Sequence, residues 1–64
     1  MTADQVMQSP KFLEAAGREA VEFLAEKHGA TTETIRAGLR TSSKLQRQLS
    51  ELVEAIAQEI ANRN

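Results

Sequence analysis

Few side chains in this sequence could carry out acid–base or metal chemistry, and they are widely spaced. His28 is the single histidine, and the chain has no cysteine, which excludes disulfides and thiolate metal sites. The nine carboxylates are spread along segments of helical periodicity, where they are typical of solvated faces and of pairs four residues apart, such as Glu14 with Arg18. Ser42 and Ser43 are typical of helix caps, and His28 of a capping or packed residue. Catalysis needs a nucleophile, a base or a metal set held in one pocket. We therefore predict no enzymatic activity, no cofactor, no metal and no small-molecule substrate.

The basic residues follow a pattern that suits an anionic partner. Residues 34–50 contain no acidic side chain, and they hold Arg36, Arg40, Lys44 and Arg47 at spacings of four, four and three. On one continuous helix these side chains form a stripe, and on two helices they flank the junction. Such a patch suits phosphate contacts and salt-sensitive binding, and it suits an acidic protein surface equally well. An ordinary solvated face is the simplest alternative.

Residues 21–40 resemble a helix-turn-helix motif. Ala25 stands four residues before Gly29, Ala30 and Thr31 follow, and Ile35 lies six residues after Gly29. In this motif two helices meet steeply around a short turn, and the second enters the major groove of DNA. The resemblance implies DNA binding, and the residues that it assigns to this contact are Thr32, Arg36, Arg40 and Lys44.

Three features depart from the helix-turn-helix pattern. His28 stands where an apolar residue is usual, and Gly38 stands where the second helix normally sends a hydrophobe inward, although Leu39 can substitute. The first helix also runs continuously from Pro10, without a separate supporting helix. The sequence therefore favours a protein partner over DNA.

Capping signals and apolar spacing predict three main helices, over about 10–28, 32–39 and 43–62. Ser9-Pro10 is a typical helix start, Gly29 a typical left-handed stop, and Thr31 or Thr32 a typical second start. Ser43 and Gln46 have the spacing of a capping box, as do Thr2 and Gln5. Residues 1–9 form either a short helical turn, with Val6 and Met7 docked on the core, or a frayed end.

The junction between the last two predicted helices has an alternative. Residues 32–62 could form one helix of about thirty residues and roughly 45 Å, whose overhang would need a second chain. Gly38 and the cluster Thr41-Ser42-Ser43 favour a break. Gly17 lies on the apolar face of the first helix, where we expect it to let another helix approach closely rather than to break the helix.

The apolar positions predict both a core and a dimer. Leu45, Leu49, Leu52 and Ile56 have the spacing of a short coiled-coil seam, and Val53 and Ile60 broaden it. We expect a symmetric homodimer built as a helical bundle, although packing within the chain could also cover this seam. The residues predicted to pack in the core or the dimer are Leu13, Gly17, Val21, Leu24, Ile35, Leu39, Leu45, Leu49, Leu52, Val53, Ile56 and Ile60.

Length and composition set the class. The chain has 64 residues, 41% hydrophobic and 3% aromatic, with abundant Ala, which indicates one small all-α domain spanning 1–64. A chain this short buries only about 60% of the surface of its unfolded form. The formal charge of −1 is unlike that of a general nucleic-acid binder. Neither a signal peptide nor a membrane span is evident, so we expect a soluble, cytoplasmic protein and, from its initial Met and polar end, a complete small gene product.

These patterns together predict a non-enzymatic, macromolecule-binding module. The first hypothesis is a small dimeric protein-interaction or regulatory protein. The alternative is a helix-turn-helix transcriptional regulator that binds DNA. A third hypothesis, a phage or plasmid structural or assembly component, depends on size and composition alone.

Overall fold

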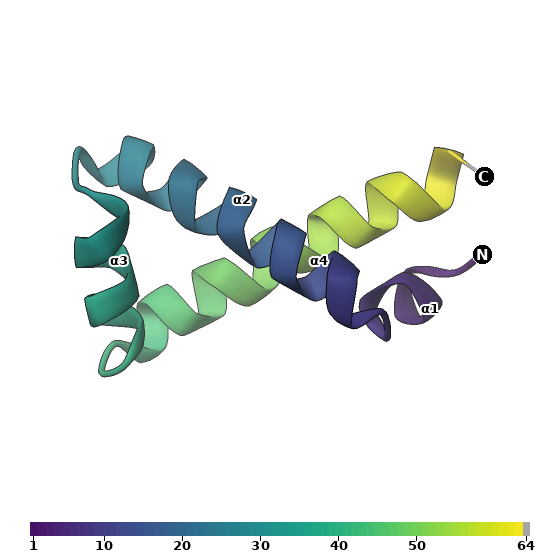
Figure 1. Ribbon diagram of the computed structural model, residues 1–64, viewed down its shortest axis with the longest axis horizontal. Helices are drawn as coiled ribbons and strands as arrows, with labels where there is room; N and C mark the ends of the chain where they lie inside the picture. Colours follow the sequence, from purple (N-terminus) through teal and green to yellow (C-terminus); the bar gives the residue numbers. More distant parts are fainter. Residues whose placement is uncertain (64) are drawn as a thin grey trace.

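The computed structural model describes residues 1–63, and all regular secondary structure within them is helical (Figure 1). The predicted all-α class is confirmed. The number of helices is four rather than three, because the N-terminal residues also form a helix. The helices are α1 (Ala3–Met7), α2 (Pro10–His28), α3 (Thr32–Leu39) and α4 (Ser43–Arg63).

The short helix α1 is held at its start by a capping box. The Gln5 backbone N–H donates to Thr2 Oγ1 at 3.2 Å, and the Thr2 backbone N–H donates to Gln5 Oε1 at 2.9 Å. Val6 is buried and Met7 packs against the core. The helical turn predicted here is confirmed, and the alternative of a frayed end is wrong.

The long helix α2 begins and ends at the predicted signals. Ser9 Oγ accepts a hydrogen bond from the Phe12 backbone N–H at 3.3 Å, and Gly29 has a φ of 63°, the left-handed conformation that glycine adopts without a Cβ penalty. The helix continues through Gly17, as predicted. However, a Cβ built on Gly17 meets no atom within 4 Å, so the close helix approach expected at this residue is wrong.

The break between α3 and α4 makes two helices of residues 32–63, so the alternative of one continuous helix is wrong. Ser42 caps α4, because its Oγ accepts from the Leu45 backbone N–H at 3.2 Å. Gln46 Nε2 donates instead to the Leu39 carbonyl at 2.7 Å, which satisfies a free acceptor at the end of α3. The capping box predicted for Ser43 and Gln46 is therefore wrong: Ser43 lies inside α4 and Gln46 closes α3.

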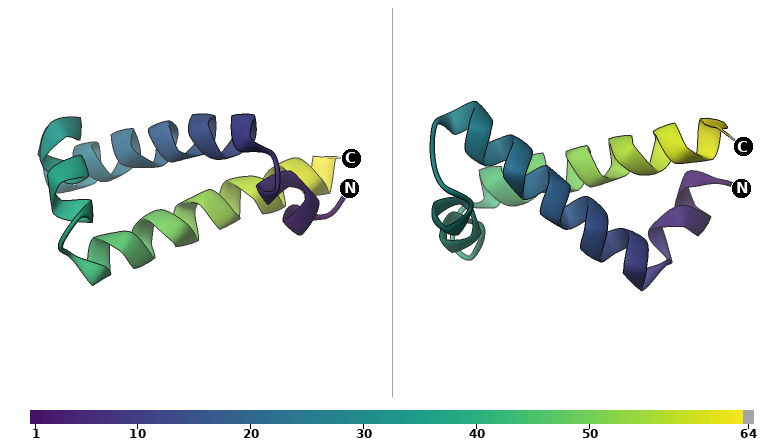
Figure 2. Two further views of the ribbon diagram at one scale, coloured as in Figure 1. Left: turned by 60° about the horizontal axis from the view of Figure 1, so that its bottom comes forward. Right: turned by 45° about the horizontal axis from the view of Figure 1, so that its top comes forward.

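The two long helices cross, and the two short ones fill the ends (Figures 1 and 2). α3 runs steeply across one end, where it joins the C-terminal end of α2 to the start of α4. α1 lies at the other end, packed against α4 and α2. The chain therefore consists of an α2–α3–α4 triangle with α1 bracing the opposite side of the crossing.

The core is small and has two parts. The first lies inside the triangle and contains Val21, Leu24, Ala25 and Ile35. The second lies at the crossing, near α1, and contains Ala16, Ala20 and Val53. Leu49 and Leu52 pack against both parts. Of the nine side chains buried among residues 1–63, four are alanines, so the core is thin.

The predicted packing residues divide into three groups by burial. Those that are buried are Val21, Leu24, Ile35 and Val53. Those that are half-buried are Gly17, Leu39, Leu45, Leu49, Leu52, Ile56 and Ile60. Leu13 remains 43% exposed, because the first turns of α2 diverge from α4 beyond the crossing. Within one chain, Leu49, Leu52 and Ile56 pack against the core, so much of the predicted seam is used internally.

Candidate macromolecule-binding surface

The helix α3 presents the predicted arginines at one end of the molecule. Ile35 is 3% exposed and points into the core, whereas Arg36 and Arg40, one turn apart, are both exposed. Thr32 is half-buried at the first turn of α3, so it is less accessible than the arginines. The exposed residues of α3 are thus Glu33, Thr34, Arg36 and Ala37, and the exposed Arg40 caps the end of the helix.

A tight turn fixes the direction of α3. The Ala30 backbone N–H donates to the Ala25 carbonyl at 2.8 Å, which closes the end of α2 around Gly29. Thr31 then caps α3, because its Oγ1 accepts from the Thr34 backbone N–H at 3.1 Å. Since Ala30 also packs against the core, the turn and the start of α3 are anchored to the same cluster that buries Ile35.

The glycine at position 38 is compensated by a side chain from α4. A Cβ built on Gly38 would lie 2.7 Å from Leu45 Cδ1, so Leu45 occupies the space where a side chain at this position would begin. Leu39, the next residue, packs against the core. The departure noted at Gly38 therefore leaves no void between α3 and α4, and it allows the two helices to approach closely.

The histidine at position 28 is exposed at the last residue of α2. An exposed side chain here fills no position in the core, so the packed alternative predicted for His28 is wrong. A metal site at this histidine has no support in residues 1–63, where no group of three or more His, Cys, Asp or Glu side chains is placed to hold an ion.

The four cations of residues 34–50 come together at the α3 end of the molecule. Arg36 lies on α3, Arg40 caps the C-terminal end of α3, Lys44 and Arg47 lie in the first turns of α4, and all four are exposed. In residues 1–63 the two ion pairs lie elsewhere, within α2 and at the end of α4: Arg18 with Glu14 at 3.4 Å, as predicted, and Arg63 with Glu59 at 2.8 Å. We call the four cations at the α3 end the basic end.

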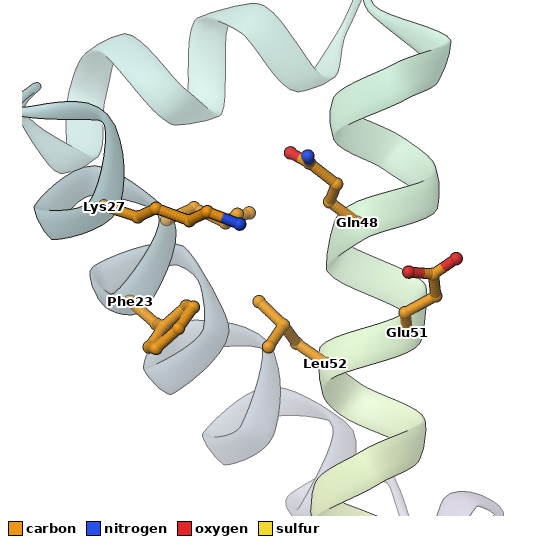
Figure 3. Close-up of a pocket in the computed structure, with 6 residues that line it drawn as sticks. Phe23, Lys27, Gln48, Glu51 and Leu52 are labelled. Carbon is orange, nitrogen blue, oxygen red and sulfur yellow. The ribbon is translucent and has the colours of Figure 1, made fainter.

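A second feature, which the sequence did not indicate, is a pocket between α2 and α4. It has a volume of about 210 Å³ and is lined by Phe23, Leu24, Lys27, Gln48, Glu51 and Leu52 (Figure 3). Phe23 is 53% exposed. Gln48 Oε1 is buried and has no hydrogen-bond partner in the described part of the chain. The sequence did not predict the polar lining, because polar residues on helix surfaces do not follow the hydrophobic periodicity. The one indication of this pocket was Phe23, which lies at the edge of the apolar stripe of the first helix.

Comparisons with known proteins identify no relative of this chain. No family model, no curated protein and no solved structure matches this chain. Within residues 1–63, no helix combines the length and the apolar character that crossing a membrane requires.

Proposed function

We propose that this protein is a non-enzymatic, helix-turn-helix DNA-binding protein, with α3 as the helix that enters the major groove. The sequence alone favours a protein partner. The observation that shifts the balance is the steep crossing of α3 over the end of α2 around Gly29, with Ile35 inward and Arg36 outward (Figure 1). This arrangement fits the motif that residues 21–40 resemble.

The dimensions and side chains of α3 support this proposal. An α-helix with its side chains is about 10–12 Å in diameter, so α3 fits a major groove about 12 Å wide, and its eight residues extend about 12 Å along the helix axis. Arginine can donate two parallel hydrogen bonds to a guanine edge or to a phosphate. Arg36 and Arg40 are therefore the proposed groove contacts, and Lys44 and Arg47 the proposed phosphate contacts beside them.

The test is a salt titration of DNA binding. The affinity for a labelled, random-sequence duplex is measured by fluorescence anisotropy at several salt concentrations. The logarithm of the association constant is expected to fall linearly with the logarithm of the salt concentration, with a slope of about −0.9 for each phosphate contacted. Four cations then predict a slope between about −2 and −4 for each bound chain. The double variant R36Q/R40Q is expected to bind at least about tenfold more weakly, and its slope should be flatter by about one for each lost phosphate contact.

The matched control for this experiment is Arg18→Gln. Arg18 is also an exposed helical arginine, but it lies on α2 and pairs with Glu14. Its replacement makes the same charge change as a single substitution of Arg36, but away from the basic end, so the affinity should stay within about twofold of that of the unmodified chain. Equal weakening by R18Q and by single substitution of Arg36, or no salt-dependent binding at all, would contradict the proposal.

A protein partner remains the second candidate, and one observation favours it. Two large apolar side chains, Leu13 and Phe23, are exposed on α2, whereas solvated faces of a small domain usually carry polar groups. The basic end would suit an acidic protein surface as well as a phosphate backbone. A pull-down from source lysate, with and without nuclease at two salt concentrations, separates the candidates: partners that persist after nuclease treatment support a protein target.

A further inference from the structure

The chain exposes more surface than its mass predicts. A compact monomer of 7.0 kDa is expected to expose about 4,000 Å², whereas this chain exposes 4756 Å². Its radius of gyration of 12.1 Å likewise exceeds the roughly 10.7 Å expected for a compact domain of this length. The excess surface, on the order of 700 Å², follows from the elongated shape of the chain, whose principal extents are 34 × 19 × 18 Å.

Part of this surface is apolar and lies at the pocket between α2 and α4. Leu24 and Leu52 line the pocket, and Phe23 stands at its α2 side with about half of its surface in solvent (Figure 3). Burial of the exposed Phe23 ring would be favourable, because burial of one aromatic ring removes a large apolar area from water. The pocket therefore offers a place for an apolar side chain from a second molecule.

The polar groups around the pocket carry both signs of charge, on opposite helices. Lys27 lies on α2, whereas Glu51 and Gln48 lie on α4 across the pocket (Figure 3). Neither Lys27 nor Glu51 belongs to the ion pairs found in residues 1–63. A binding partner that satisfies this rim must present an anion opposite α2 and a cation opposite α4.

A second copy of the chain meets that requirement by symmetry. In a symmetric dimer both copies use the same surface patch. A two-fold axis that runs along the pocket, between the two copies, places α2 of one copy over α4 of the other. Lys27 of each copy then faces Glu51 and Gln48 of the other. A partner that carried only positive or only negative groups would leave either Lys27 or Glu51 without an opposite charge. An unpaired charge is unfavourable in a contact from which water is excluded.

We propose that the pocket between α2 and α4 is a homodimer interface, in which Phe23 of each copy enters the pocket of the other and Lys27 pairs with Glu51 across the two-fold axis. This interface shares Leu52 with the leucine seam of α4 that the sequence indicates, but the rest of that seam lies outside the pocket and packs largely within the chain. Its lining residues include none of the four cations of the basic end, so it can be tested without DNA.

The first test measures mass as a function of protein concentration by sedimentation equilibrium. The unmodified chain is expected to associate reversibly to twice its monomer mass of 7.0 kDa. Phe23→Ala should raise the dissociation constant at least about tenfold. Leu13→Ala is the matched control, because it truncates the other exposed apolar side chain of α2 and should leave the constant within about twofold. A chain that stays monomeric at all concentrations, or equal effects of F23A and L13A, would overturn the proposal.

The second test exchanges the rim charges. Lys27→Glu and Glu51→Lys should each weaken association, and the double variant K27E/E51K should recover most of the lost affinity, because the pair is restored with reversed signs. Circular dichroism of each variant checks that the helices persist. Both substituted side chains are exposed, so the monomer fold should tolerate the change. Failure of the double variant to recover dimerisation would overturn the proposed Lys27–Glu51 pairing and the two-fold arrangement with it.

Discussion

The two ends of the molecule differ in what they bury and in the charge that they expose. The α3 end encloses Leu24 and Ile35, which are 1% and 3% exposed. The α1 end depends on a five-residue helix that buries Val6 and packs Met7 against the small cluster of Ala16, Ala20 and Val53. The larger buried side chains thus lie beneath α3, at the end where a fixed helix orientation would matter for binding.

The charge distribution follows the same division. Residues 34–50 hold four of the eight basic residues and none of the nine acidic ones, so the rest of the chain carries nine acidic and four basic residues. A formal charge of −1 therefore conceals a basic end and an acidic remainder. Net charge alone is therefore a poor guide to the local charge of a surface in so small a chain, because local charge governs contacts within a Debye length.

The largest expected effect is a loss of stability when a core side chain beneath α3 is truncated. Leu24→Ala should lower the free energy of unfolding by about 2–5 kcal/mol, since it removes the largest fully buried side chain and leaves a cavity. Val6→Ala, at the α1 end, should cost only about 1–2 kcal/mol, because two methyl groups are lost at roughly 0.8 kcal/mol each. Urea unfolding followed by circular dichroism measures both, at one protein concentration because association adds to stability.

Equal losses of unfolding free energy from Leu24→Ala and Val6→Ala would show that the α3 end and the α1 end contribute equally to stability. A larger loss from Val6→Ala would reverse it, and α1 rather than α3 would then be the element on which the fold depends.

A smaller effect, of opposite sign, is expected at Gly17 in the middle of α2. Gly17→Ala should raise the free energy of unfolding by up to about 1 kcal/mol, because alanine restricts the unfolded chain and favours helix. The added methyl group meets no atom within 4 Å. Thermal unfolding is expected to show a higher midpoint. A lower midpoint would mean that a second helix does approach Gly17, either within the chain or in the dimer.

Local signals in the sequence were enough to place the start and end of α2 and the start of α3. Ser9, Gly29 and Thr31 act through hydrogen bonds and backbone conformations only a few residues away, so their roles could be predicted. Gln46 could not be assigned correctly, since its partner is the Leu39 carbonyl on the preceding helix. Its bond depends on the angle between α3 and α4, which sequence spacing does not specify.

The basic end and the pocket between α2 and α4 also differ in whether the sequence could predict them. The basic end was predictable because charge is a property of residue type and the window 34–50 is contiguous. The pocket was not, because Phe23 and Glu51 are far apart in the sequence and are brought together by the crossing of α2 and α4. The exposed state of Leu13 has the same origin, since periodicity places it on the apolar face and the divergence of the helices uncovers it.

The most direct test of the central claim is an NMR titration of the ¹⁵N-labelled chain with short duplex DNA. Binding through the basic end predicts that amide shifts change most in α3 and the first turns of α4, around Arg36, Arg40 and Lys44. The amides of α1 and of the C-terminal half of α4 should move little. Shifts concentrated around the α1 end, or no saturable shifts at low salt, would contradict the proposal that α3 is the DNA-binding helix.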